Sequence, residues 1–71
     1  MTAVEEIAEK ARRLSAAGRK RDEVIDAMLE LGHAAGFVVI GETIRDGRLA
    51  LDFHNGEVIE FDGTDWHYKR V

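Results

Sequence analysis

Residues 49–68, LALDFHNGEVIEFDGTDWHY, decide the fold because apolar and polar residues alternate on both sides of the turn sequence HNG. A two-residue turn would pair Phe53 with Val58 and divide the large apolar side chains between two faces, since a shift of one residue turns every side chain over. A three-residue loop, in which a type I turn is followed by a glycine bulge, places Leu51 opposite Ile59 instead. We predict the three-residue loop, because it gathers the large apolar side chains on one face.

The neighbouring turns extend this pairing to four strands. The predicted strand segments are FVVIGETIR (37–45), RLALDF (48–53), EVIEF (57–61) and DWHYKRV (65–71). We predict a two-residue turn at 46–47 and a four-residue loop at 62–65. The resulting pairing gives three rows of neighbouring side chains on the core face. The first row is Ile44, Leu49, Phe61 and Trp66, the second is Glu42, Leu51, Ile59 and Tyr68, and the third is Ile40, Phe53, Glu57 and Arg70. The outer face is expected to be polar, with Arg48 opposite Asp62, Glu60 opposite His67, and Asp52 near Val58 and Lys69. Such a sheet needs a cover on one side only.

The segment before residue 37 has the period of two helices. In the first, Thr2 and Glu5 form a capping box, and Gly18 is the expected stop. Its narrow apolar stripe has the spacing of a heptad and consists of Val4, Ile7, Ala11 and Leu14. The second helix is expected to end at Gly32 or Gly36. Its predicted buried side consists of Val24, Ile25, Met28, Leu29 and Leu31.

The short link through Gly18 makes the helices an antiparallel pair. We therefore predict an α+β fold, α-α-β-β-β-β, in which two N-terminal helices pack on one face of a four-stranded antiparallel β-meander. The expected organisation is a single domain over 1–71, with the helical pair at 2–35 and the antiparallel sheet at 37–71.

Composition restricts the classes of function. The 71-residue chain carries a net charge of −4 and contains neither cysteine nor proline. That charge is mild, and its sign is wrong for general DNA affinity. No apolar run approaches the roughly 20 residues of a membrane-spanning helix, and the N-terminal residues lack a secretory hydrophobic segment. We expect a soluble, cytoplasmic protein that does not associate with a membrane.

No residue pattern predicts an enzyme, a metal site or a cofactor. The three histidines, His33, His54 and His67, lack the spacing of metal ligands. Glu60 and His67 are neighbours in the predicted sheet, but an exposed cross-strand pair of this kind is ordinary. We expect no catalytic, cofactor-binding or metal-binding residues.

Glu42 is the one acidic residue that strict alternation places beside Leu51 on the core face. A buried carboxylate there, near Tyr68, would be a candidate for an enzyme or a ligand-binding site. Alternatively, Gly41 forms a bulge on this edge strand and turns Glu42 toward solvent. The second interpretation is the simpler one.

The strongest charge feature lies between residues 10 and 21, where six basic residues occur without an acid. Five of them are predicted to bind a partner: Arg12, Arg13, Arg19, Lys20 and Arg21. This basic corner either docks on an acidic protein, serves a helix-turn-helix whose second helix enters a DNA groove, or is only solvated. The exposed acids of that second helix would meet phosphates unfavourably. They are Asp22, Glu23, Asp26 and Glu30.

The size of the chain and its lack of catalytic motifs resemble the compact accessory proteins of phages and mobile elements, many of which block a larger protein. We expect a small non-enzymatic binding protein that inhibits or regulates a larger protein or nucleoprotein complex by surface contact. The alternative is a DNA-binding transcriptional regulator that uses the basic corner. A homodimer through helix faces or sheet edges is also expected, because small domains without disulfides or structural metal ions often gain stability by association.

Overall fold

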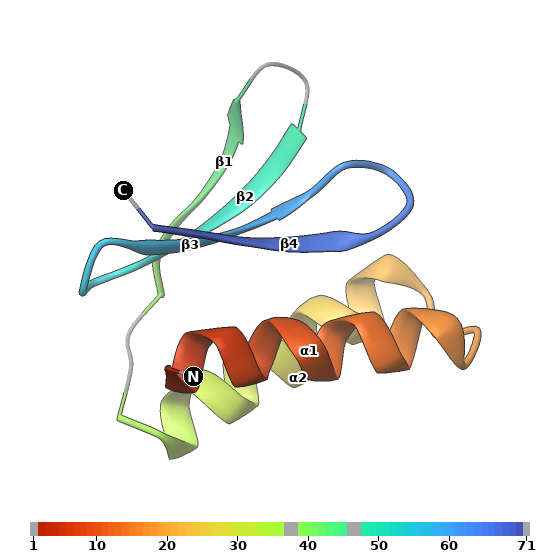
Figure 1. The fold of residues 1–71 in the computed structure, drawn as a ribbon, viewed down its shortest axis with the longest axis horizontal. Coiled ribbons are helices and arrows are strands. Elements are labelled where there is room, and N and C mark those ends of the chain that lie inside the picture. Colours follow the sequence, from red (N-terminus) through yellow and green to blue (C-terminus); the bar gives the residue numbers. More distant parts are fainter. Residues whose placement is uncertain (1, 37–38, 46–47, 71) are drawn as a thin grey trace.

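The computed structural model describes residues 2–36, 39–45 and 48–70, and the segment 39–45 only by its backbone. The elements are α1 (Ala3–Ala16), α2 (Arg21–Ala34), β1 (Val39–Arg45), β2 (Arg48–Phe53), β3 (Glu57–Phe61) and β4 (Trp66–Arg70). Figure 1 shows the two helices side by side and antiparallel on one side of the sheet. The predicted α+β class, with two helices beside an antiparallel sheet, is confirmed for β2, β3 and β4.

The pairing of β2 with β3 confirms the three-residue HNG loop. Leu51 lies opposite Ile59 and Leu49 opposite Phe61. The backbone N–H of Gly56 donates to the carbonyl oxygen of Phe53 at 3.1 Å. Gly56 has a φ of +88°, the left-handed conformation that the glycine position of such a bulge requires.

The pairing of β3 with β4 also follows the prediction. Phe61 lies opposite Trp66, Ile59 opposite Tyr68, and Glu57 opposite Arg70. The Phe61 and Trp66 rings are 4.5 Å apart between centroids and tilted by 31°, within the range of favourable aromatic pairs.

The backbone of β1 runs antiparallel to β2, with Ile44 opposite Leu49. The register shifts between Val39 and Gly41, so that Val39, and not Ile40 as predicted, lies opposite Phe53. A bulge at residue 40, between Val39 and Gly41, accounts for the difference. The Glu42 side chain lies outside the described residues, so its burial stays untested. The four-stranded meander likewise remains a prediction.

Helix α1 begins and ends as its sequence predicts. Thr2 and Glu5 form the capping box, with Thr2 Oγ1 accepting from the Glu5 N–H at 3.2 Å and Glu5 Oε1 accepting from the Thr2 N–H at 3.1 Å. At the other end, Gly18 has a φ of +90°. The N–H groups of Gly18 and Arg19 donate to the carbonyl oxygens of Ser15 and Leu14 at 3.1 and 3.0 Å. This pair of bonds is a Schellman motif, which turns the chain sharply into α2.

Helix α2 differs from the prediction on its buried side. It continues to Ala34, so Gly36, with a φ of +82°, follows its end, and Gly32 is buried inside the helix. Leu31, which we expected to be buried, is 38% exposed. Leu31 faces away from the sheet because the buried side chains of Val24, Ile25 and Met28 set the core side of the helix.

The core lies between α1, α2 and the inner face of the sheet. Helix α1 packs directly against β3 and β4, and α2 packs against α1. The buried core residues are Val4, Ile7, Ala8, Ala11, Val24, Ile25, Met28, Leu51, Phe53, Ile59 and Trp66. The apolar stripe of α1 is therefore used inside the molecule, and it is not a free coiled-coil seam.

The outer face of the sheet is less polar than predicted. Ala50 is fully buried and Val58 is 2% exposed, although both alternate with the core residues. Lys69 lies opposite Val58, and its Nζ is 3.3 Å from Glu60 Oε1. The Glu60 side chain is only 14% exposed. Long charged side chains thus cover the middle of this face with their hydrocarbon stems.

Candidate functional site

The predicted basic corner lies at the end of the molecule where α1 turns into α2. Arg19 and Lys20 form this turn, and Arg21 begins α2. Arg12 and Arg13 belong to the last turns of α1, but they lie on different sides of it. Arg12 reaches β4, whereas Arg13 lines a groove between the two helices. The structure therefore divides the five residues into a basic turn, defined as residues 19–21, and two flanking arginines.

Three of the arginines have an acidic neighbour in the same chain. The pairs are Arg13 with Glu9 at 4.0 Å, Arg19 with Glu23 at 3.2 Å, and Arg21 with Asp22 at 3.5 Å. The arginine side chains are 74%, 61% and 57% exposed, respectively. Exposed pairs of this kind contribute little to stability. The acids nevertheless offset part of the positive charge of these three arginines.

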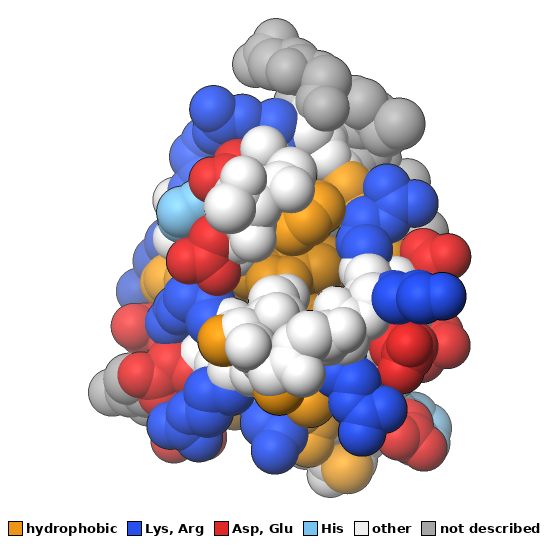
Figure 2. Space-filling model, turned by 90° about the vertical axis from the view of Figure 1, so that its right-hand side faces the viewer, with side chains coloured by type: hydrophobic (Ala, Val, Ile, Leu, Met, Phe, Trp, Pro, Cys, Tyr) orange, Lys and Arg blue, Asp and Glu red, His pale blue; other side chains and the backbone are white. Residues whose placement is uncertain are grey.

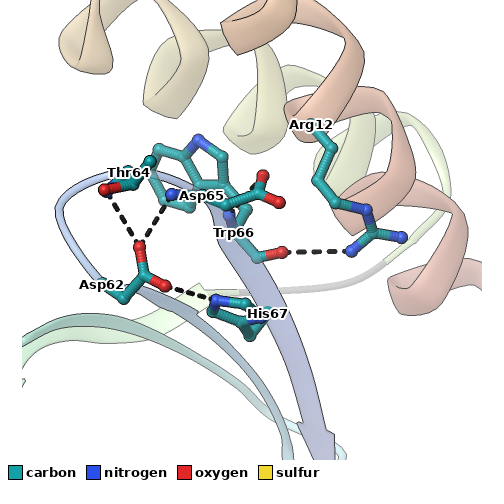
Figure 3. A network of polar contacts seen from close by, with 6 residues as sticks. All are labelled: Arg12, Asp62, Thr64, Asp65, Trp66 and His67. Atoms are coloured by element: carbon teal, nitrogen blue, oxygen red, sulfur yellow. Dashed lines mark hydrogen bonds and ion pairs between the residues drawn. The ribbon is translucent and has the colours of Figure 1, made fainter.

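Arg12 differs from the other four basic residues because its side chain is hydrogen-bonded to the sheet. Its guanidinium donates to the carbonyl oxygen of Trp66 at 3.1 Å (Figure 3). The indole Nε1–H of Trp66 donates to Ser15 Oγ at 2.8 Å. Two polar contacts thus fasten the C-terminal half of α1 to the start of β4. Trp66 is fully buried, so its indole N–H needs such a partner.

A shallow hollow of about 280 Å³ opens between the end of α1 and the β3–β4 loop. It is lined by Arg12, Ser15, Ala16, Thr64 and Asp65. Figure 2 faces this end of the molecule and shows Lys and Arg side chains over the helical half, interrupted by acidic ones, with hydrophobic side chains visible near the centre. The surface is therefore mixed in charge, with a basic excess around the turn.

The β3–β4 loop is held by Asp62. Its Oδ1 accepts from the backbone N–H groups of Thr64 and Asp65 at 2.8 and 2.7 Å, and its Oδ2 lies 2.6 Å from His67 Nε2 (Figure 3). The hydrogen bond from the Asp65 backbone is the largest of the influences that lower the pKa of Asp62, followed by the contact with His67. His67 thus has Asp62 as its acid, while Glu60 pairs with Lys69.

A buried carboxylate, Glu57, was not singled out by the sequence. It is 3% exposed. Its Oε2 accepts from Thr2 Oγ1 at 2.7 Å and from the Tyr68 hydroxyl, and its Oε1 accepts from Asn55 Nδ2 at 2.5 Å. The backbone N–H of Glu57 also donates to Asn55 Oδ1 at 3.1 Å. This Glu57 cluster joins the start of α1, the HNG loop and β4.

The hydrogen bonds decide the charge of Glu57. Burial by itself raises the pKa of this carboxyl, but the hydrogen bonds from Tyr68, Thr2 and Asn55, with the charge of Arg70, outweigh burial and lower the pKa below its ordinary value. The pKa of Tyr68 is raised, because its hydroxyl donates to the carboxylate. Both groups therefore keep their ordinary neutral-pH forms and hold one another in place.

Other features of the described residues add little chemistry. Among the side chains that the structure describes, in 2–36 and 48–70, no three His, Asp or Glu come together in a way that would hold a metal ion. In the same segments, neither helix is long and apolar enough to cross a membrane. Comparison of the chain with protein-family models, with curated proteins and with solved structures finds no match in any of the three.

Proposed function

We propose that the protein is a small non-enzymatic binding protein that regulates or inhibits a larger protein, or a nucleoprotein complex, by contact through its basic turn. The observation that carries the proposal is the exposure of this turn on a firmly held end of the molecule. The Schellman motif at Gly18 orders the turn, and the contacts of Arg12 and Ser15 tie the neighbouring helix to β4. A preorganised surface loses little conformational entropy when it binds.

The chemistry of the turn favours an acidic partner. Lys20 has no ion-pair partner among the residues that the structure describes. The ion pairs of Arg19 and Arg21 are exposed to solvent, so a partner's carboxylates can replace or join the acids that they now contact. Arginine is also the charged residue that protein interfaces favour most. Arg12 and Arg13 flank this contact in the proposal.

The non-enzymatic part of the proposal is supported by the state of Glu57. Three side-chain donors already occupy this carboxylate, and its pKa is lowered. A general base near neutral pH needs a raised pKa and a free oxygen that faces the substrate. The cluster therefore fits a structural role, in which it links three segments of the chain, better than a catalytic role.

The alternative function is DNA binding by the same turn. Its weakness lies on α2, whose exposed positions include Asp22, Glu23, Asp26 and Glu30. A helix that carries these acids would be repelled by phosphates in a DNA groove. We therefore rank the DNA-binding regulator second.

The experiment is a capture of partners by the tagged protein from a lysate of its native cells, followed by a binding measurement with the purified partner. The test variant reverses the turn, Arg19→Glu, Lys20→Glu and Arg21→Glu. The matched control reverses two basic residues on the sheet, Arg48→Glu and Lys69→Glu. We expect the turn variant to lose about 100-fold in affinity and the control to change far less.

A partner that binds the turn variant with unchanged affinity would refute the site. Salt-dependent retention on DNA that disappears in the turn variant, with no protein captured, would favour the regulator instead. Circular dichroism and Trp66 fluorescence of each variant establish that its fold is intact.

The finer description of the fold belongs to the same proposal. We propose that β1 completes a four-stranded meander within a single cytoplasmic domain. The pairing of β1 with β2 from Val39 to Arg45 supports the meander. Hydrogen exchange provides the test: amides of β1 that pair with β2 should exchange more slowly than those of the 54–56 loop, and equal rates would reject the fourth strand.

A further inference from the structure

We propose that the face of the helical pair that points away from the sheet is the interface of a two-fold symmetric homodimer. Two adjoining hollows of about 520 and 580 Å³ follow the groove between α1 and α2 on this face. They share Lys10 and Leu31. Leu31 is the one large hydrophobic residue classed as exposed among the described side chains.

The apolar part of this face is a strip of small side chains around Leu31. The strip consists of Leu14, Ala27, Leu31, Ala34 and Ala35. Small residues allow two helix surfaces to approach closely, and the exposed leucine can occupy the groove of a facing copy. This strip is not the heptad-spaced row of α1 that the sequence analysis describes. Val4, Ile7 and Ala11 of that row are already buried inside the subunit.

The charges along α1 favour a second copy of the chain as the partner that binds this groove. On this face the N-terminal half of α1 carries Glu6 and Glu9, and the C-terminal half carries Lys10 and Arg13. A two-fold axis that crosses α1 between residues 9 and 10 brings two copies of the helix together in antiparallel orientation. Residue 6 then faces residue 13 of the other copy, and residue 9 faces residue 10. Along α1, both acids are therefore level with a base of the other copy, in an isologous contact that closes after two subunits.

The charges are available for such a contact. Glu6 and Lys10 have no ion-pair partner among the described residues, and the pair between Glu9 and Arg13 is long at 4.0 Å. In the proposed dimer each of these four side chains gains an opposite charge across the interface. Complementary rims of this kind mainly determine orientation and specificity, while the buried apolar strip supplies the affinity.

The same two-fold axis also brings the apolar residues of the two copies together. Leu31 lines the groove beside Lys10, close to the level at which the axis crosses α1. The two copies of Leu31 are therefore near each other at the centre of the interface, where burial is greatest. The four helices form a layer between the two sheets, and the outer faces of both sheets stay free.

The test begins with sedimentation velocity of the purified chain over a concentration series up to the hundred-micromolar range. We expect a concentration-dependent rise from 8.0 kDa toward twice that mass. Leu31→Glu should give a monomer at all these concentrations. A wild-type chain that stays at 8.0 kDa throughout, or a dimer that Leu31→Glu does not weaken, would overturn the proposal.

A charge swap tests the two-fold arrangement itself. Glu6→Lys and Arg13→Glu should each weaken the dimer about tenfold, because each places like charges at two symmetric contacts. The double variant Glu6→Lys/Arg13→Glu should recover the wild-type dissociation constant, because the charges at positions 6 and 13 are both exchanged and remain opposite. Arg48→Glu, on the sheet, is the matched control and should have no effect. Failure of the double variant to recover would refute the antiparallel pairing of α1.

Arg13 belongs to both proposals, but residues 19–21 lie outside this interface, so the turn variant and Leu31→Glu test the two proposals separately. The turn variant should remain a dimer, and Leu31→Glu should keep the basic turn intact on a monomer. Far-UV circular dichroism and Trp66 fluorescence again separate loss of association from loss of folding.

Discussion

Replacing the buried carboxylate of the Glu57 cluster tests whether this polar joint stabilises the fold. Glu57→Ala removes the acceptor for the hydroxyls of Thr2 and Tyr68 and for the Asn55 amide. A hydrogen bond to a charged group contributes roughly 1.5–3 kcal/mol. The freed hydroxyls can regain water, and the alanine no longer pays for burial of a charge. We therefore expect a net loss of about 2–3 kcal/mol in the free energy of unfolding.

The assay is urea denaturation at neutral pH, followed by the fluorescence of Trp66. This residue is the only tryptophan and is fully buried, so it reports unfolding directly. A loss of 2–3 kcal/mol corresponds to roughly 10–20 °C in melting temperature for a domain of this size. The matched control is Glu60→Ala in the same strand, which breaks the ion pair with Lys69 and should cost at most about 1 kcal/mol.

The effect should also depend on pH with a definite sign. The pKa of Glu57 is lowered in the folded protein from an ordinary value of 4.5. Its contribution to stability is therefore fully present above pH 4.5 and is lost as the pH falls through the folded pKa. The difference between wild type and Glu57→Ala should shrink on acidification. If Glu57→Ala costs no more than Glu60→Ala at pH 7, or if the difference grows in acid, the reasoning about the cluster is wrong.

Two further predictions test the turns. Gly56→Ala should destabilise the protein by about 1 kcal/mol, because the φ of +88° at this position is strained for any residue with a β-carbon; a urea midpoint equal to that of wild type would contradict the bulge. Asp62 should titrate at a lower pH than an ordinary aspartate of pKa 3.8, because the backbone N–H of Asp65 heads the contacts that stabilise its charged form. Carbon-detected NMR of its carboxyl group measures this directly, and the contribution of Asp62 to stability should be present above pH 3.8 and disappear in more acidic solution.

Local rules account for the parts of the fold that the sequence predicts. The HNG register follows from one argument about which faces the apolar residues share, and the structure has Leu51 opposite Ile59 as expected. The capping box and the stop at Gly18 depend on residues within a few positions of each other. Such signals are readable from one sequence, because each requires a particular residue type in a particular place.

The predictions that are wrong concern burial that depends on packing between distant segments of the chain. The helical period of α2 is compatible with Leu31 on the buried side, but α2 packs with Val24, Ile25 and Met28 buried and leaves Leu31 38% exposed. The sequence also cannot show how strongly the sheet bends or how long side chains cover Val58 on its outer face. Crossing angles and sheet curvature are tertiary properties, and propensity alone does not determine them.

The Glu57 cluster shows how a partner far away in the sequence changes the meaning of a residue. Strict alternation places Glu57 on the core face, in the same predicted row as Arg70. That placement was itself a signal, because a carboxylate on an apolar face must find donors. One donor, Thr2, lies 55 residues away. Only the docking of α1 on the sheet brings it into contact, so the burial could be suspected from sequence but its partners could not.

The two proposed surfaces have a joint consequence for how the protein would bind. The axis between residues 9 and 10 crosses α1 at its midpoint, since the helix runs from Ala3 to Ala16. The two basic turns of the dimer therefore lie at opposite ends of the helical layer, separated by at least one helix length, roughly 21 Å at 1.5 Å per residue. A partner with a single acidic site would bind each end independently, with two partners per dimer. A partner that repeats its acidic site at a matching separation would gain from the high effective concentration of the second turn. Leu31→Glu would then weaken binding of the repeated partner while leaving binding of the single site unchanged, so the same variant distinguishes the two kinds of target.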